Sequence, residues 1–221
     1  MPWSESAQGH RLGNGGDMLK RYLPIAAAAA ACGTLLGGCS STLKATALGA
    51  DGRFATGAKV AADDVSVKQP FDRAKFGKLA YVKKLGDNQT MNSFFHDSIV
   101  NTKMFENVVD QSGMEKLVIQ HNIENVSGAD SLIALHKLQA EIGPFLVIEP
   151  YVEWKGGYNY EASLKVVDPD TTETIFSAKK KAFNWGGLDK PLFYPLFNAL
   201  LDWLNNRPID TAAPPPAPVK G

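Results

Sequence analysis

The sequence predicts one α+β domain in which antiparallel hairpins are covered by helices. Two patterns indicate this class. Apolar and polar residues alternate over residues 158–166, the period of a strand with one buried face. Apolar residues recur at helical spacing over residues 193–204, as in an amphipathic helix. Between residues 76 and 206 the predicted elements follow the order β-α-β-α-α-β-β-β-α.

The first three elements follow from two short apolar runs and the polar residues between them. Leu79–Val82 reads Leu-Ala-Tyr-Val between polar neighbours, which is typical of a buried strand. Residues 88–90 supply side chains that cap a helix, and Phe95 and Ile99 recur at helical spacing before the helix ends near Met104. Residues 105–109 then predict a second strand.

Two further helices are predicted from apolar spacing and stop signals. Residues 112–123 form the first, with Leu117 and Val118 directed inward. Asp130 is the expected cap of the second, which ends at Gly143-Pro144. Its apolar face consists of Leu132, Leu135, Leu138 and Ile142.

Three long strands follow, over residues 145–154, 158–166 and 173–185. Gly156-Gly157 and the sequence Asp-Pro-Asp-Thr at 168–171 are typical hairpin turns. Pro150 lacks a backbone N–H and therefore predicts either a bulge or an edge position in the first of these strands. We expect the last helix, over residues 193–204, to lie across the sheet and close the core.

The element order and four local features are similar to those of a group of envelope domains. The features are Phe-Glu-Asn-Val at 105–108, Ile-Gly-Pro-Phe-Leu-Val at 142–147, Val-Asp-Pro-Asp-Thr at 167–171, and the apolar C-terminal helix. The domain resembles that of the curli secretion-channel lipoprotein and the N-terminal domain of the Tol-system β-propeller protein. Penicillin-binding-protein activator lipoproteins and flagellar accessory lipoproteins are similar in design. The resemblance implies a periplasmic domain, and no loop is long enough for the pore-forming insertions of the curli protein.

The N-terminal segment resembles a bacterial lipoprotein signal peptide. Lys20-Arg21 precedes an apolar run that ends in Leu36-Gly37-Gly38-Cys39, the pattern of a lipobox. Leu36, Gly37 and Gly38 would be recognised by the signal peptidase, and Cys39 would carry a diacylglycerol and an N-acyl chain. The alternative is an uncleaved membrane span, for which Pro24 and the glycines are unfavourable.

This interpretation divides the chain into five parts. Residues 1–17 are a spurious extension before the start at Met18, and residues 18–38 are the signal peptide. Residues 39–75 are a lipidated flexible tether, residues 76–206 the α/β domain, and residues 207–221 a disordered proline-rich tail. Ser40 follows the lipidated cysteine, which favours the periplasmic face of the outer membrane over the inner membrane.

Composition argues against several classes of function. Basic and acidic residues balance at 23 each, and no clustered basic face indicates nucleic-acid binding. Cys32 lies in the signal segment, so a lipidated Cys39 leaves no thiol for catalysis or metal binding. The histidines, at positions 10, 96, 121 and 136, show no metal-ligand spacing. We therefore expect no catalytic residue, no metal site and no cofactor beyond the covalent lipid.

Aromatic residues are the remaining candidate for function. Trp154, Tyr158, Tyr160 and Trp185 fall on or beside the predicted hairpins. Burial in the core would explain most of them, and a partner-binding surface is the alternative. The first hypothesis is a membrane-anchored, non-enzymatic module that binds an envelope protein or assembles with itself. The second is a ligand-binding or auxiliary lipoprotein of a lipid transport system, which requires an apolar pocket beneath the last helix.

Overall fold

The computed structural model describes residues 43–184 and 187–213. The predicted extension and signal peptide, the lipobox with Cys39, Trp185, and residues 214–221 of the predicted tail lie outside the described residues. In the described part of the chain, no helix combines the length and apolarity that crossing a membrane requires.

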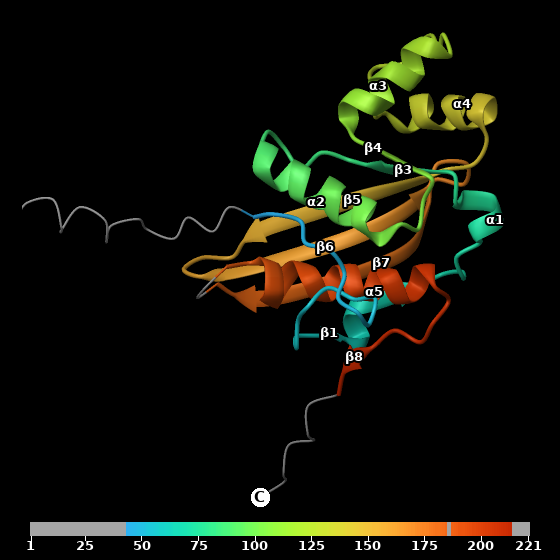
Figure 1. Ribbon diagram of the computed structural model, residues 1–221. Helices are drawn as coiled ribbons and strands as arrows, with labels where there is room; N and C mark the ends of the chain where they lie inside the picture. The colour runs from blue at the N-terminus through green and yellow to red at the C-terminus, as the bar shows by residue number, and fades with distance from the viewer. Residues whose placement is uncertain (1–42, 185–186, 214–221) are drawn as a thin grey trace, which may run out of the picture. The chain divides into compact units, whose positions relative to one another are not determined.

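The described residues confirm the α+β class (Figure 1). The strands are β1 Val60–Ala61, β2 Val65–Val67, β3 Leu79–Val82, β4 Asn107–Val109, β5 Leu146–Trp154, β6 Asn159–Asp168, β7 Glu173–Phe183 and β8 Thr211–Ala212. The helices are α1 Arg73–Phe76, α2 Gln89–Thr102, α3 Gln111–Gln120, α4 Leu132–Ile142 and α5 Tyr194–Leu204. A π-helical stretch, Asp189–Phe193, leads into α5.

Six strands form the main sheet in the order β2-β7-β6-β5-β3-β4. Neighbouring strands are antiparallel except at β3, which runs parallel to both β4 and β5. Helix α2 connects β3 to β4, and α3 and α4 connect β4 to β5. The β5–β6 and β6–β7 hairpins are the predicted ones, and strand β1 pairs separately with β8.

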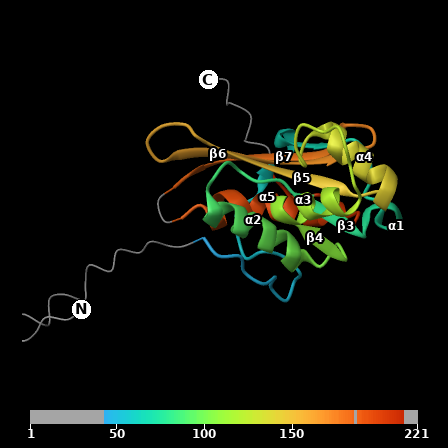
Figure 2. The same cartoon turned by 90° about the horizontal axis from the view of Figure 1, so that it is seen from above.

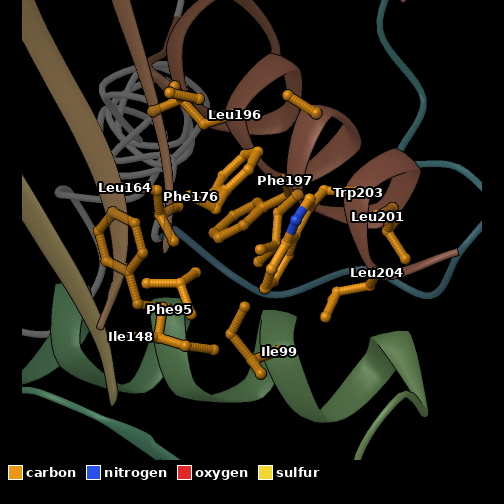
Figure 3. Close-up of a cluster of buried hydrophobic side chains, with 14 of the residues drawn as sticks. Phe95, Ile99, Ile148, Leu164, Phe176, Leu196, Phe197, Leu201, Trp203 and Leu204 are labelled. Atoms are coloured by element: carbon orange, nitrogen blue, oxygen red, sulfur yellow. The ribbon is translucent and has the colours of Figure 1, made fainter. Parts of the chain in front are cut away.

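Helices cover both faces of the sheet, and each face has its own core. Leu164 and Phe176 face α2 and α5, and Figure 3 shows these side chains packed with those of both helices. Val147 faces the other way, into a smaller core with Leu135 of α4 and Met114 of α3. In Figure 1, α3 and α4 lie side by side beyond β3 and β4. Burial of each such side chain contributes about 1.5–3 kcal/mol.

Capping residues were predicted in part. Asn88 caps α2 as expected, because its side-chain oxygen accepts the N–H of Met91 at 3.1 Å. The expected cap of α4 is wrong by one residue: Ser131 accepts the N–H of Ala134 at 3.2 Å. Leu132, expected on the inward face of α4, is the first residue of the helix and is 49% exposed.

Pro150 occupies an edge position without a bulge. It pairs in regular register with Leu164 of β6. On the other side β3 ends at Val82, opposite Ile148, so the described part of β5 beyond Ile148 has β6 as its one neighbour. The missing N–H of Pro150 therefore breaks no bond to a second strand.

Helix α5 crosses the sheet as predicted, but it is buried on every side. All its residues are buried, including Asn198 and Asp202. The outer side is covered by residues 43–71, which we call the N-terminal strap. The strap inserts Phe54, Val60 and Phe71 into the main core, and each is at most 3% exposed.

The predicted tether is therefore wrong for residues 43–75. The strand suggested at residues 64–68 forms as β2, antiparallel to β7. Residues 73–76 form α1, capped by Asp72. The strap lacks periodicity because it enters the core with single, widely spaced apolar residues, and such a pattern resembles a linker in the sequence.

Three polar side chains spaced four residues apart, two within α5 and one just beyond its end, bind the strap. Asn198 accepts the N–H of Phe54 at 2.9 Å and donates to its carbonyl at 3.0 Å. Asn206 makes the same pair of bonds with Phe71, at 3.1 and 2.9 Å. Between them, Asp202 accepts two bonds from the guanidinium of Arg53, at 2.7 and 3.1 Å.

The predicted C-terminal tail is wrong for residues 207–213. Asp210 donates its N–H to Asp202 at 3.0 Å and forms an ion pair with Lys59 at 2.7 Å. Strand β8 then pairs in parallel with β1 of the strap. The folded domain therefore includes the described residues from 43 to 71 and from 207 to 213.

Candidate functional site

Trp154, Tyr158 and Tyr160 lie where the β5–β6 hairpin projects beyond the end of β3. Gly156 and Gly157 form its turn with φ of 96° and 58°, values that favour glycine. The N–H of Lys155 donates to the carbonyl of Asn159 at 2.8 Å and closes the hairpin. This turn places the end of β5 and the start of β6 beside the end of β7.

Three large aromatic side chains at the hairpin turn and the facing end of β7 are more than half exposed, and Tyr151, further back along β5, is 51% exposed as well. Trp154 is 63% exposed, Tyr158 59% and Phe183 52%. We call these residues the aromatic end. The rings of Tyr158 and Phe183 pack together with centroids 5.6 Å apart, and the indole N–H of Trp154 donates to the carbonyl of Gly157 at 2.8 Å. These contacts hold the exposed rings in place.

The structure describes three of the four predicted aromatic residues and places them differently. Trp154 and Tyr158 belong to the aromatic end, whereas Tyr160 is half-buried and packs against the main core. Trp185 lies outside the described residues. Phe183 was not among the predicted site residues, and its position as the last residue of β7 was the signal that could have identified it.

Charged groups near the aromatic end are arranged in neutral pairs. Glu153 contacts Lys155 at 2.7 Å, and Glu161 contacts Lys181 at 3.6 Å. The hydrogen bond from Lys155 lowers the pKa of the Glu153 carboxyl. The Tyr151 hydroxyl donates to Glu153 at 3.2 Å, and that bond raises the pKa of Tyr151. These two ion pairs therefore add no net charge to this end of the sheet.

A hollow of about 460 Å³ adjoins Phe183. It is lined by Lys155, Asn159, Tyr160, Glu161, Lys181, Ala182 and Phe183. The lining combines aromatic faces with the paired charges of Glu161 and Lys181. A side chain of a partner could insert here with apolar contact on one side and hydrogen-bonding groups on the other.

A second hollow, of about 450 Å³, opens at the carboxyl ends of β3 and β4. Ligands of α/β sheets bind at such a position, where successive helices leave for opposite faces. Lys83 pairs with Glu149 at 3.1 Å, and His96 contacts Asp97 at 2.9 Å. The hydroxyl of buried Tyr81 donates to Gln111, and burial raises its pKa.

This second hollow, which we call the polar hollow, is lined by residues from two segments, 82–97 and 110–115. It was not among the sites predicted from the sequence. The sequence feature that could have identified this hollow is the pair of helix N-caps that follow β3 and β4. Its charges are of both signs, and the raised pKa of Tyr81 keeps that hydroxyl protonated. Among the described residues, no cluster of three or more His, Cys, Asp or Glu could hold a metal ion.

The space beneath α5 is filled by aromatic rings. Phe94 and Phe95 of α2 meet Phe193 and Phe197 with ring centroids 5.2–5.7 Å apart. Each of these rings is at most 1% exposed. This packing disfavours the second hypothesis, because an apolar ligand beneath α5 would have to displace the rings.

No protein-family model matches the chain, and no curated protein matches it. The chain is similar to the solved LpoB C-terminal domain from Escherichia coli, at 12% identity and a TM-score of 0.34, over 52% of this chain and 88% of that one. It is also similar to the PelC dodecamer from Paraburkholderia phytofirmans, at 12% identity and a TM-score of 0.34, over 63% and 95%. Lipoprotein GNA1162 from Neisseria meningitidis matches at 14% identity and a TM-score of 0.32, over 58% and 96%. These likenesses do not support the resemblance to the curli and Tol-system domains, and at these TM-scores they carry no argument about function.

Proposed function

We propose that this chain is an envelope lipoprotein, attached through lipid on Cys39 to the periplasmic face of the outer membrane. Its folded domain binds a protein partner and catalyses no reaction. The observation that carries the proposal is the aromatic end, where Trp154, Tyr158 and Phe183 are each more than half exposed.

Support for the anchor comes from the N-terminal sequence. Lys20-Arg21, the apolar run and Leu36-Gly37-Gly38-Cys39 stand in the order that lipidation requires. A diacylglycerol and an N-acyl chain together exceed the single chain that gives only marginal membrane binding. Ser40 favours the outer membrane.

Support for partner binding comes from the chemistry of the exposed residues. Trp and Tyr are enriched among the residues that contribute most to protein–protein affinity. The rings of the aromatic end are uncharged, and the ion pairs of Glu153 with Lys155 and of Glu161 with Lys181 lie beside them, a combination of apolar and polar groups that is common in interfaces. The proposal of a non-enzymatic role rests on the polar hollow, whose charged lining residues are of both signs.

The anchor is tested by Cys39→Ser in the full-length chain, expressed in its own cells with radiolabelled palmitate. The native chain should take up the label and sediment with outer membranes, and the variant should do neither. Labelling of the variant would contradict the assignment of Cys39.

Partner binding is tested by photo-crosslinking in the same cells, with a photoreactive amino acid at position 155. The native background should give a reproducible protein adduct, and Trp154→Ala combined with Phe183→Ala should reduce it at least about tenfold, the effect of losing one hot spot. Ile119→Ala is the matched control, because Ile119 is 73% exposed on α3. An adduct that is absent, or equally strong in all three backgrounds, would contradict binding at the aromatic end.

A further inference from the structure

The strap fixes how much chain separates the lipid from the folded domain. Residues 43–71 are part of the domain, so three residues, 40–42, join Cys39 to Leu43. The four steps from Cys39 to Leu43 span at most about 14 Å when fully extended. A tether of residues 39–75 would instead have an extended length of about 130 Å.

The beginning of the strap is held firmly in the domain. The Thr46 hydroxyl bonds the Tyr194 hydroxyl at 3.0 Å, and the Thr46 carbonyl accepts from Asn101 at 3.0 Å. Leu43 and Leu48 pack against the main core on either side of this contact. The short link therefore remains short unless the strap is pulled out of the core.

The strap begins at the same end of the sheet as the aromatic residues. Figures 1 and 2 both place the start of the described chain, in blue, at the end where the β5–β6 hairpin turns. The lipid attached a few residues earlier would hold this end toward the membrane. A domain of this size is about 40 Å across, so the opposite end is the part that extends away from the bilayer.

The charges beside the aromatic end favour a protein over lipid headgroups. A surface that binds anionic lipid carries an excess of Lys and Arg, each contributing about 1 kcal/mol. Here Lys155 is paired with Glu153 and Lys181 with Glu161. The carboxylate beside each of these two lysines weakens its attraction to an anionic bilayer, and the exposed rings remain as the main source of affinity.

We infer that the aromatic end lies against the membrane that holds the lipid, and that its partner is a protein embedded in that same membrane. The inference rests on the proposed function, because it requires the anchor on Cys39 and binding at the aromatic end. It adds that the domain does not reach across the periplasm, since the link is too short.

The test compares three full-length chains in cells, each with the photoreactive amino acid at position 155. The first chain has no other change. The second carries a flexible insert of about 30 Gly and Ser residues between Thr42 and Leu43, and the third carries the same insert between Ala213 and Pro214. Palmitate labelling and resistance to proteolysis verify that each chain is anchored and folded.

The native chain and the chain with the C-terminal insert should give the same adduct with an integral outer-membrane protein. The N-terminal insert should reduce this adduct about tenfold, because the effective concentration falls steeply with the length of a flexible link. An adduct unaffected by the N-terminal insert overturns the inference but leaves partner binding intact. An adduct with phospholipid, with a soluble protein or with an inner-membrane protein also overturns it. The lack of any adduct in all three chains overturns the proposed function itself.

Discussion

Replacing Asn198 by alanine should destabilise the domain by releasing the strap. Asn198 is 6% exposed, and its amide holds both backbone polar groups of Phe54, which is 1% exposed. Alanine removes both partners at once. The N–H and the carbonyl of Phe54 would then remain buried without a hydrogen bond, or the strap would leave the core to reach water.

The expected magnitude follows from these two groups. An unsatisfied buried polar group costs about 1–3 kcal/mol, so two of them cost about 2–6 kcal/mol. Partial withdrawal of the strap limits the loss, and we expect a decrease of about 3 kcal/mol in the free energy of unfolding. With an m-value of about 2 kcal/mol/M, the urea midpoint should fall by about 1.5 M.

Urea unfolding of residues 40–221, followed by circular dichroism, measures this decrease. Asn101→Ala is the matched control, because Asn101 also donates to the strap backbone, at the carbonyl of Thr46, but through an exposed bond at 3.0 Å. Its loss should cost less than about 1 kcal/mol. If Asn198→Ala were no more destabilising than Asn101→Ala, the strap would not be part of the core.

Three further substitutions test single features. In Asn198→Asp, burial and the facing carbonyl of Phe54 raise the pKa of the new carboxyl above its unfolded value of about 3.9. The stability of this variant relative to the native chain should therefore be greatest below about pH 3.9 and should fall as pH rises through the folded pKa. Urea midpoints of both chains at acidic and at neutral pH measure this change. A difference between the two midpoints that stays constant with pH would refute the prediction. Gly113→Ala should cost about 1–3 kcal/mol in urea unfolding, because its Cβ would lie 2.8 Å from the Cβ of Val109. Thr172→Gly should raise the melting temperature by about 2–4 °C, since Thr172 is held at a φ of 59°; an unchanged melting temperature would show that the turn carries no strain.

Elements with a sustained period could be predicted from the sequence. Strand β6 alternates over its length, and Ala162, Leu164 and Val166 are all fully buried as that pattern requires. The apolar spacing along α5 likewise predicted a helix across the sheet. In both cases the period of the backbone selects which residues face the core, so the sequence carries the information locally.

The strap could not be predicted in this way, because the interactions that hold it join residues far apart in the sequence. Asn198 on α5 has no reason to be buried until Phe54, 144 positions earlier, lies over it. In the sequence, Asn198 and Asp202 indicate that the outer face of the helix is exposed to solvent. Their true role appears only when the backbone of the strap supplies the donors and acceptors that each side chain needs.

The candidate site was predictable in composition but not in exposure. Trp154 and Tyr160 lie opposite each other in the β5–β6 pairing, yet the first is 63% exposed and the second packs against the core. The difference arises because the hairpin projects beyond the helices that cover the sheet. The local sequence does not specify how far the covering helices extend along the sheet.

The polar groups that hold the strap thus connect stability with position at the membrane. If Asn198 and Asn206 released Phe54 and Phe71, the link between Cys39 and the sheet would lengthen from a few residues to about thirty. Its root-mean-square span would then be about 30 Å, beyond the limit of about 14 Å set by the docked strap. Asn198→Ala in the full-length, anchored chain should therefore weaken crosslinking at position 155 as well as stability, although Asn198 lies in the core and not at the aromatic end. A variant that loses stability but crosslinks as well as the native chain would separate the two effects, and would show that the short link does not position the aromatic end.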